Sequence, residues 1–168
     1  MEDERTMVTF VSGSWRFTYR VGAIVIRDRH ALLTRNLTED YWFTPGGRVE
    51  IGESAHTAIE REITEELGLV GRIERLLWSS ENFFRIGGTS YHEIALYFLV
   101  VLPEDAHTDL SAKFYCEETD GTRFEFAWHR IDALDEISLV PGFLVDALAN
   151  LPEAPQHILH VDDSLQRN

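Results

Sequence analysis

Hydrophobic and polar residues alternate in short runs along most of the chain, and this pattern predicts β-strands. Two aliphatic runs, 17–28 and 30–36, are divided by the polar stretch RDRH, which predicts a hairpin. Three later runs, at 72–80, 91–102 and 123–131, each predict a further strand. The second of these holds a continuous apolar stretch, which is typical of a strand buried on both faces.

Two segments instead predict helices. The first spans 55–67, because Ser54 is a suitable N-cap and Gly68 suits the left-handed residue that ends many helices. The second spans 141–151 and has a proline near its first turn. Residues 103–122 are polar without a clear period and predict a long loop, and 155–168 predict one short strand. Strands on both sides of two helices indicate an α+β or mixed α/β sandwich.

Length and charge favour one soluble domain. A chain of 168 residues suffices for one buried core and is short for two, so 1–168 are expected to form a single domain. The balance of 29 Asp+Glu against 15 Lys+Arg gives a formal charge of -14, which disfavours extended nucleic acid as a partner. Cys116 is the only cysteine, so no intrachain disulfide can form. Without a membrane-length apolar run, a cytoplasmic location is the expectation.

The first predicted helix crowds glutamates onto its core-facing side. On a wheel with roughly 100° per residue, Glu62, Glu65 and Glu66 fall inside or at the border of the apolar arc, whereas Glu60 falls on the opposite face. Glu62 and Glu66 are like charges four residues apart, which is unfavourable in a helix. The only lysine or arginine of this helix is Arg61. The three carboxylates therefore predict a bound positive species.

A hard divalent cation, Mg²⁺ or Mn²⁺, fits these oxygen ligands best. The alternative is an ordinary glutamate-rich helix with solvated charges, which accounts for Glu60 and not for the other three. The preceding stretch PGGRVEIGES has three glycines that let the backbone approach a ligand, and it offers the Gly47 carbonyl to a metal. Together, the loop and the helix predict a cradle for Mg²⁺ and a diphosphate.

These residues match a known pattern, G-x5-E-x7-R-E-U-x-E-E-x-G-U, in which U is a bulky aliphatic residue. This pattern is the signature of the Nudix hydrolase superfamily, which the chain resembles over roughly residues 16–148. Every defined position is filled, by Gly47, Glu53, Arg61, Glu62, Ile63, Glu65, Glu66, Gly68 and Leu69. The resemblance implies an α/β/α sandwich around a mixed β-sheet and places the chain near a bacterial subgroup.

The resemblance implies metal-dependent hydrolysis of a nucleoside diphosphate linked to another moiety. Glu62, Glu65 and Glu66 correspond to the metal-binding glutamates, and the Gly47 carbonyl to a further ligand. Arg61 corresponds to the arginine that orients them, and Glu53 to a residue that supports the loop. Glu62 is the first choice as general base, and four later glutamates are alternatives. These are Glu93, Glu117, Glu118 and Glu125.

Substrate contacts are expected from Gly46, Gly47, Arg35 at the end of a predicted strand, and Arg48 in the loop, with Arg85 as a weaker candidate. Five aromatic residues could stack on a base or belong to the core, and these are Trp42, Phe43, Phe83, Phe84 and Tyr91. The main rival function is a nucleotide sensor that binds without hydrolysis. The nucleotide itself stays open, and a homodimer is suggested only by analogy with relatives.

Overall fold

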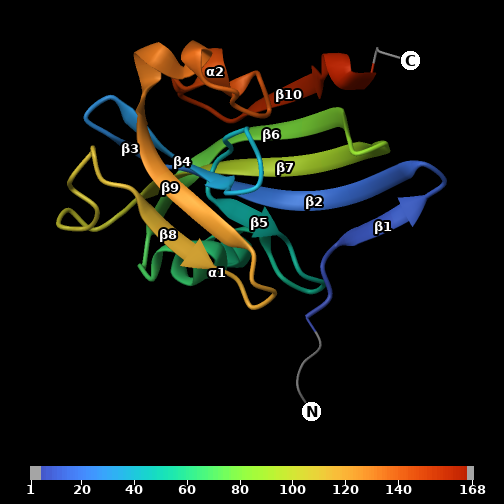
Figure 1. Ribbon diagram of the computed structural model, residues 1–168, viewed down its shortest axis with the longest axis horizontal. Coiled ribbons are helices and arrows are strands. Elements are labelled where there is room, and N and C mark those ends of the chain that lie inside the picture. Colours follow the sequence, from blue (N-terminus) through green and yellow to red (C-terminus); the bar gives the residue numbers. More distant parts are fainter. Residues whose placement is uncertain (1–4, 166–168) are drawn as a thin grey trace.

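The computed structural model describes residues 5–165, which form two β-sheets with helical elements on opposite sides (Figure 1). The strands are β1 (Thr9–Ser12), β2 (Trp15–Ile24), β3 (Ile26–Arg27), β4 (His30–Asn36), β5 (Gly46–Arg48), β6 (Arg72–Ile86), β7 (Thr89–Val101), β8 (Phe114–Glu117), β9 (Arg123–Arg130) and β10 (Gln156–Val161). The helical elements are α1 (Ala55–Leu67), η1 (Ile131–Glu136), α2 (Leu144–Ala147) and η2 (Asp163–Leu165).

The larger sheet has the strand order β1-β2-β7-β6-β10, and β5 pairs with β2. It is mixed, because β2 and β7 are parallel, β6 and β7 are antiparallel, and β10 is parallel to β6. The smaller sheet, β3-β4-β9-β8, is antiparallel throughout. The predicted α+β class with a mixed sheet is confirmed.

The predicted hairpin between 17–28 and 30–36 is only partly right. β2 lies in the larger sheet, where it pairs with β7 over ten residues, and only β3 turns back onto β4. Asp28 and Arg29, with φ of 45° and 61°, form this turn. The local pattern does not reveal this change of sheet, because the partner strand β7 is distant in the chain.

Strands β6 and β7 are longer than the sequence pattern predicts and join in one hairpin. The runs expected at 72–80 and 91–102 extend to Ile86 and back to Thr89, with Gly87 and Gly88 at the turn. The sequence underestimates β6 because polar residues interrupt its apolar pattern. In the folded protein Ser80 and Asn82 are nevertheless buried, and the Asn82 amide donates to the Ser80 hydroxyl.

The second helix, predicted over 141–151, is wrong in length, because α2 spans only Leu144–Ala147. One turn is enough to bury Leu144 and Leu148, so packing does not require a longer helix. The predicted loop 103–122 contains the additional strand β8, which pairs with β9. The short strand predicted in the C-terminal tail is confirmed as β10.

Helix α1 begins and ends where the sequence predicts. The Ser54 hydroxyl accepts a hydrogen bond from the Thr57 amide at 3.1 Å, and Gly68 adopts a left-handed conformation with φ of 66°. Ala58, Ile59 and Ile63 are buried against the larger sheet. The apolar side of α1 therefore fixes the rotation of the helix, and with it the direction of the glutamates. Among residues 5–165, no helix is long and apolar enough to cross a membrane.

Candidate active site

Two of the three predicted carboxylates lie against the glycine loop. Glu62 is 8% exposed, and its carboxylate occupies the space that a Cβ atom at Gly47 would fill. Glu66 lies one turn further and accepts a hydrogen bond from the Gly46 amide at 3.0 Å. A side chain at Gly47 would clash with Glu62 of α1, and one at Gly46 would clash with the Val21 backbone of β2, so the two glycines allow β5 to lie close to both elements. The glycine loop and the acidic side of α1 are therefore in direct contact.

Glu65 is oriented differently from the prediction of a half-buried carboxylate. Its side chain is 42% exposed and forms ion pairs with Arg5 at 2.6 Å and with Arg61 at 3.2 Å. On the helical wheel Glu65 lies at the border of the apolar arc, and the structure resolves that ambiguity toward solvent.

Arg61 holds the glutamates in place from the middle of the cluster. Its Nε donates to Glu53 at 2.8 Å, Nη1 donates to Glu62 at 2.7 Å, and Nη2 donates to the Arg48 carbonyl at 3.1 Å. Glu53 also accepts a hydrogen bond from the Glu50 amide at 3.0 Å, which closes the loop. Arg61 thus contacts Glu53 and Glu62 at once, and Glu53 joins α1 to the loop before it.

The electrostatics of the cluster differ from those of a solvated surface. Burial raises the pKa of Glu62, although Arg61 partly offsets this effect. Burial and the charge of Glu62 raise the pKa of Glu66 well above its ordinary value. Hydrogen bonds from Arg61 lower the pKa of Glu53. Two carboxyls that resist ionisation next to each other are suited to a site that a cation neutralises.

The donor atoms fit a hard divalent cation. Glu62, Glu66 and the backbone of Gly46 and Gly47 offer an oxygen-rich corner. Within residues 5–165, however, no three acidic, His or Cys side chains already converge on one point. Glu65 is the member that points elsewhere, because it is engaged by two arginines.

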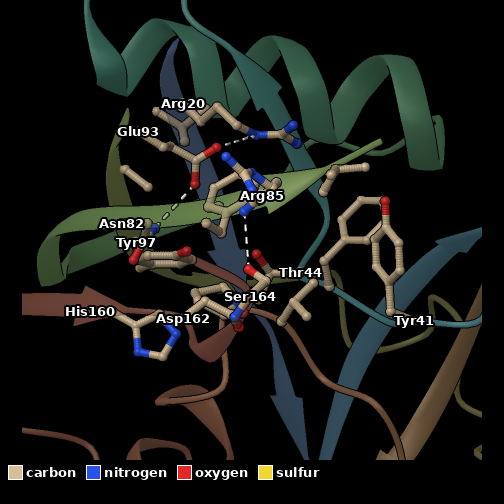
Figure 2. A pocket seen from close by; sticks show the side chains of 18 residues that line it. Arg20, Tyr41, Thr44, Asn82, Arg85, Glu93, Tyr97, His160, Asp162 and Ser164 are labelled. Carbon is tan, nitrogen blue, oxygen red and sulfur yellow. Dashed lines mark hydrogen bonds and ion pairs between the residues drawn. The ribbon is translucent and has the colours of Figure 1, made fainter. Parts of the chain in front are cut away.

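A cavity of about 310 Å³ is lined by strands β2, β6 and β7 of the larger sheet, by residues 41–44 and 140–141, and by the C-terminal segment. Figure 2 shows Arg20 and Glu93 at the end nearer α1, and His160, Asp162 and Ser164 at the other end. The remaining wall is largely aromatic and aliphatic. It includes Tyr41, Phe43, Phe84, Ile86, Tyr97, Val140 and Pro141.

Arg20 links the cavity to the acidic cluster. It extends from β2, where its backbone lies opposite Arg48 of β5, and it forms a long ion pair of 3.9 Å with Glu93. Its positive charge also lowers the pKa values of Glu62 and Glu66, partly offsetting their burial. Glu93 is held more firmly by the Asn82 amide at 3.1 Å and by the Thr18 hydroxyl at 3.3 Å. Arg20 therefore remains available for an anionic ligand.

The predicted substrate arginines divide into two groups. Arg48 is exposed, and partial desolvation together with the charges of Arg20 and Arg16 lowers its pKa. Arg85 lines the cavity. Arg35 does not line the cavity, because it pairs with Glu125 at 3.4 Å and its guanidinium covers the Trp42 ring at 4.9 Å. Arg35, expected to contact the substrate, has a buried partner in Glu125 of the neighbouring strand β9.

Of the aromatic residues considered for stacking on a base, some line the cavity and others lie away from it. Phe43 and Phe84 line the cavity, and Tyr91 stacks on Phe84 with ring centroids 4.9 Å apart. Trp42 is a core residue beneath Arg35, and Phe83 stacks on His92 away from the cavity.

The four later glutamates occupy different surroundings. Glu125 is buried and pairs with Lys113 and Arg35, while Glu117 is exposed near Arg123. Glu93 lines the cavity. Glu118 is exposed and follows β8, whose Cys116 Sγ lies 3.9 Å from the Glu65 carbonyl. Partial desolvation and the charges of Asp120 and Glu65 raise the pKa of Glu118.

Residues 16–148 match the model of the NUDIX domain, and the chain therefore belongs to the Nudix family. An 8-oxo-dGTP diphosphatase of Buchnera aphidicola is 26% identical over 149 residues, which cover 86% of this chain and 92% of that protein. An RNA pyrophosphohydrolase of Ruthia magnifica is 33% identical over 73 residues, which cover 43% of this chain and only 41% of that relative.

Solved structures agree on the fold. A UDP-X diphosphatase aligns with a TM-score of 0.58 at 22% identity and covers 89% of this chain and 68% of that one. A MutT protein of Bacillus halodurans aligns with a TM-score of 0.57 at 17% identity and covers 87% and 92%. With relatives named as pyrophosphohydrolases and diphosphatases, the protein is an enzyme of the Nudix hydrolase class.

The sequence did not predict several of the side chains that line the cavity. They are Arg20, Asn82, Tyr97, His160, Asp162 and Ser164, all of which line the cavity. Arg20 did carry a signal, because a charged residue there interrupts a strand that is otherwise largely apolar. The C-terminal residues carried none, since only the pairing of β10 with β6 brings them to the cavity.

Proposed function

We propose that the protein hydrolyses the pyrophosphate of a single nucleotide, with the nucleoside in the aromatic cavity and the diphosphate at the acidic cluster. The observation that supports this proposal best is the position of Arg20, between Glu93 in the cavity and the carboxylates of α1. A cavity of about 310 Å³ lies near the lower end for small-molecule sites, which favours one nucleoside over two.

We further propose that Glu62, Glu65, Glu66 and the Gly47 carbonyl hold Mg²⁺, with Mn²⁺ as a substitute. When bound, such a cation neutralises the diphosphate and makes the attacking water more acidic. Arg61 orients the carboxylates, Gly46 and Gly47 let the backbone approach the phosphates, and Arg20 and Arg48 attract them. The negative chain would otherwise repel the substrate.

The general base in this proposal is Glu118. Glu62, the first choice from the sequence, is buried and already accepts a hydrogen bond from Arg61 at 2.7 Å. Glu118 follows β8, whose Cys116 Sγ lies 3.9 Å from the Glu65 carbonyl, so its carboxylate is carried toward the acidic cluster and can serve as the proton acceptor for the attacking water.

The rival proposal, a sensor that binds nucleotides without hydrolysis, would not require an intact set of acidic residues around Arg61. Such a set is present here, with Glu53, Glu62 and Glu65 all within ion-pair distance of Arg61. We therefore favour hydrolysis. A homodimer and a cytoplasmic location stay predictions.

A nucleotide panel tests the proposed function. We expect turnover of at least one nucleoside diphosphate or triphosphate with Mg²⁺ or Mn²⁺, and products cleaved within the pyrophosphate. Glu66→Gln removes one charge and little volume, so it should lower kcat by about 100-fold or more while the protein stays folded. Tight nucleotide binding without turnover across the panel would favour the sensor, and unchanged turnover in the variant would refute the metal assignment.

A further inference from the structure

The segment before β1 runs along the glycine loop, although it lies outside the region that matches the family, 16–148. The Thr6 carbonyl accepts a hydrogen bond from the Ile51 amide at 2.8 Å, and the Val8 amide donates to the Val49 carbonyl at 2.8 Å. Met7 forms an antiparallel bridge with Glu50. These backbone contacts fix the path of residues 6–8 beside the loop that leads into α1.

This path delivers Arg5 to the acidic cluster. Its Nη1 lies 2.6 Å from Glu65 Oε1 and 3.7 Å from Glu50 Oε1. The other oxygen of Glu65 accepts a hydrogen bond from Arg61 at 3.2 Å. Both carboxylate oxygens of Glu65 are therefore engaged by arginines.

A divalent cation can use Glu65 only if one of these arginines releases an oxygen. Arg61 is 15% exposed and also binds Glu53, Glu62 and the Arg48 carbonyl, so releasing it would disrupt the whole cluster. Arg5 is 58% exposed, and within residues 5–165 its ion-pair partners are Glu65 and Glu50. Exposed ion pairs contribute little to stability, so the contact with Arg5 is the easier one to release.

We propose that Arg5 is a positioning residue of the metal centre. In the metal-free protein Arg5 forms an ion pair with Glu65, and this ion pair breaks when the cation binds. Arg5 then stabilises the metal-free cluster and weakens metal affinity, because both positive species compete for the same carboxylate. This inference rests on the proposed metal site but not on which nucleotide is cleaved.

The test compares the wild-type protein with three variants, Arg5→Ala, Arg5→Lys and Arg130→Ala. Arg130 forms an exposed ion pair of 2.8 Å with Asp132, so its variant loses the same charge and a similar contact elsewhere. Calorimetry would measure the Kd for Mn²⁺, and thermal unfolding in a chelator would measure the midpoint of the metal-free protein.

We expect Arg5→Ala to bind Mn²⁺ about three- to tenfold more tightly, because a like charge beside the cation is removed. Its metal-free midpoint should fall by about 1–3 °C. Arg5→Lys keeps the charge and should retain the affinity of the wild type, as should Arg130→Ala.

An unchanged or weaker affinity in Arg5→Ala would overturn the inference, as would a wild-type protein that binds no Mn²⁺. The result is separable from the proposed function. Tighter Mn²⁺ binding without turnover of any nucleotide would refute hydrolysis alone, and normal turnover with unaltered affinity would refute the role of Arg5 alone.

Discussion

At the scale of single residues, the glutamates of α1 differ sharply although they lie within two turns. Glu62 and Glu66 are directed at the glycine loop, Glu65 is held by arginines at the surface, and Glu60 is exposed. The pattern of the sequence predicts the inward direction of the first two, because apolar neighbours fix the rotation of the helix. It does not predict the direction of Glu65, which depends on Arg5, a residue 60 positions away.

The buried carboxyl of Glu66 predicts a pH dependence of stability. Its pKa in the folded protein is raised well above the ordinary 4.5, so the folded state retains a proton that the unfolded chain has lost, and stability falls as pH rises above about 4.5. In a chelator, Glu66→Gln should therefore have a higher free energy of unfolding than the wild type at pH 7.5. This difference, the stability gap, should shrink toward pH 4.5.

Urea unfolding across this pH range measures the gap. Glu60→Gln is the matched control, because Glu60 is an exposed carboxylate of the same helix and should give no gap. A gap that is independent of pH would show that the charge of Glu66 is not what the folded protein disfavours.

At the scale of elements, the hairpin of β8 and β9 places a further carboxylate over α1. The turn closes through a hydrogen bond from the Glu118 amide to the Thr122 carbonyl at 2.8 Å. Cys116 packs against the core, and its Sγ lies 3.9 Å from the Glu65 carbonyl. The sequence hides β8 in an acidic stretch, because its short strand gains stability only by pairing with β9.

The hairpin predicts different effects for two adjacent glutamates. Glu118→Gln should lower kcat by about 100-fold or more with little change in KM, because it removes the proposed proton acceptor. Glu117→Gln should keep near-normal kcat, since Glu117 is exposed and lies near Arg123. Steady-state kinetics on a nucleotide from the panel distinguishes the two, and normal kcat in Glu118→Gln would return Glu62 or Glu93 to the role of base.

At the scale of the whole molecule, the site combines parts that are distant in sequence. Arg20 comes from β2, the carboxylates from α1, Asn82 and Phe84 from β6, and His160 from β10 (Figure 2). The parallel pairings of β2 with β7 and of β10 with β6 bring these strands together. Neither pairing is signalled locally, because parallel neighbours need not be adjacent in the chain.

The cavity predicts that Phe84 contributes to substrate binding. Phe84→Ala should raise KM about tenfold and change kcat by less than about twofold, because loss of a stacking surface costs about 1–3 kcal/mol per base. Phe10→Ala is the control, since Phe10 is 59% exposed and lies outside the cavity lining. A fall in kcat with unchanged KM would show that the nucleobase of the substrate does not stack on Phe84.

The sequence by itself determined the class of fold, the limits of α1, the acidic cluster and its glycine loop, because all of these depend on local spacing. Ser54 and Gly68 mark the helix ends, and the apolar side directs Glu62 and Glu66 inward. Only the tertiary structure decided which arginine faces the cavity, which later glutamate lies near the cluster, and what engages Glu65. Each of these depends on strands or segments that meet in space, since a side chain's partner is set by packing rather than by its position in the chain.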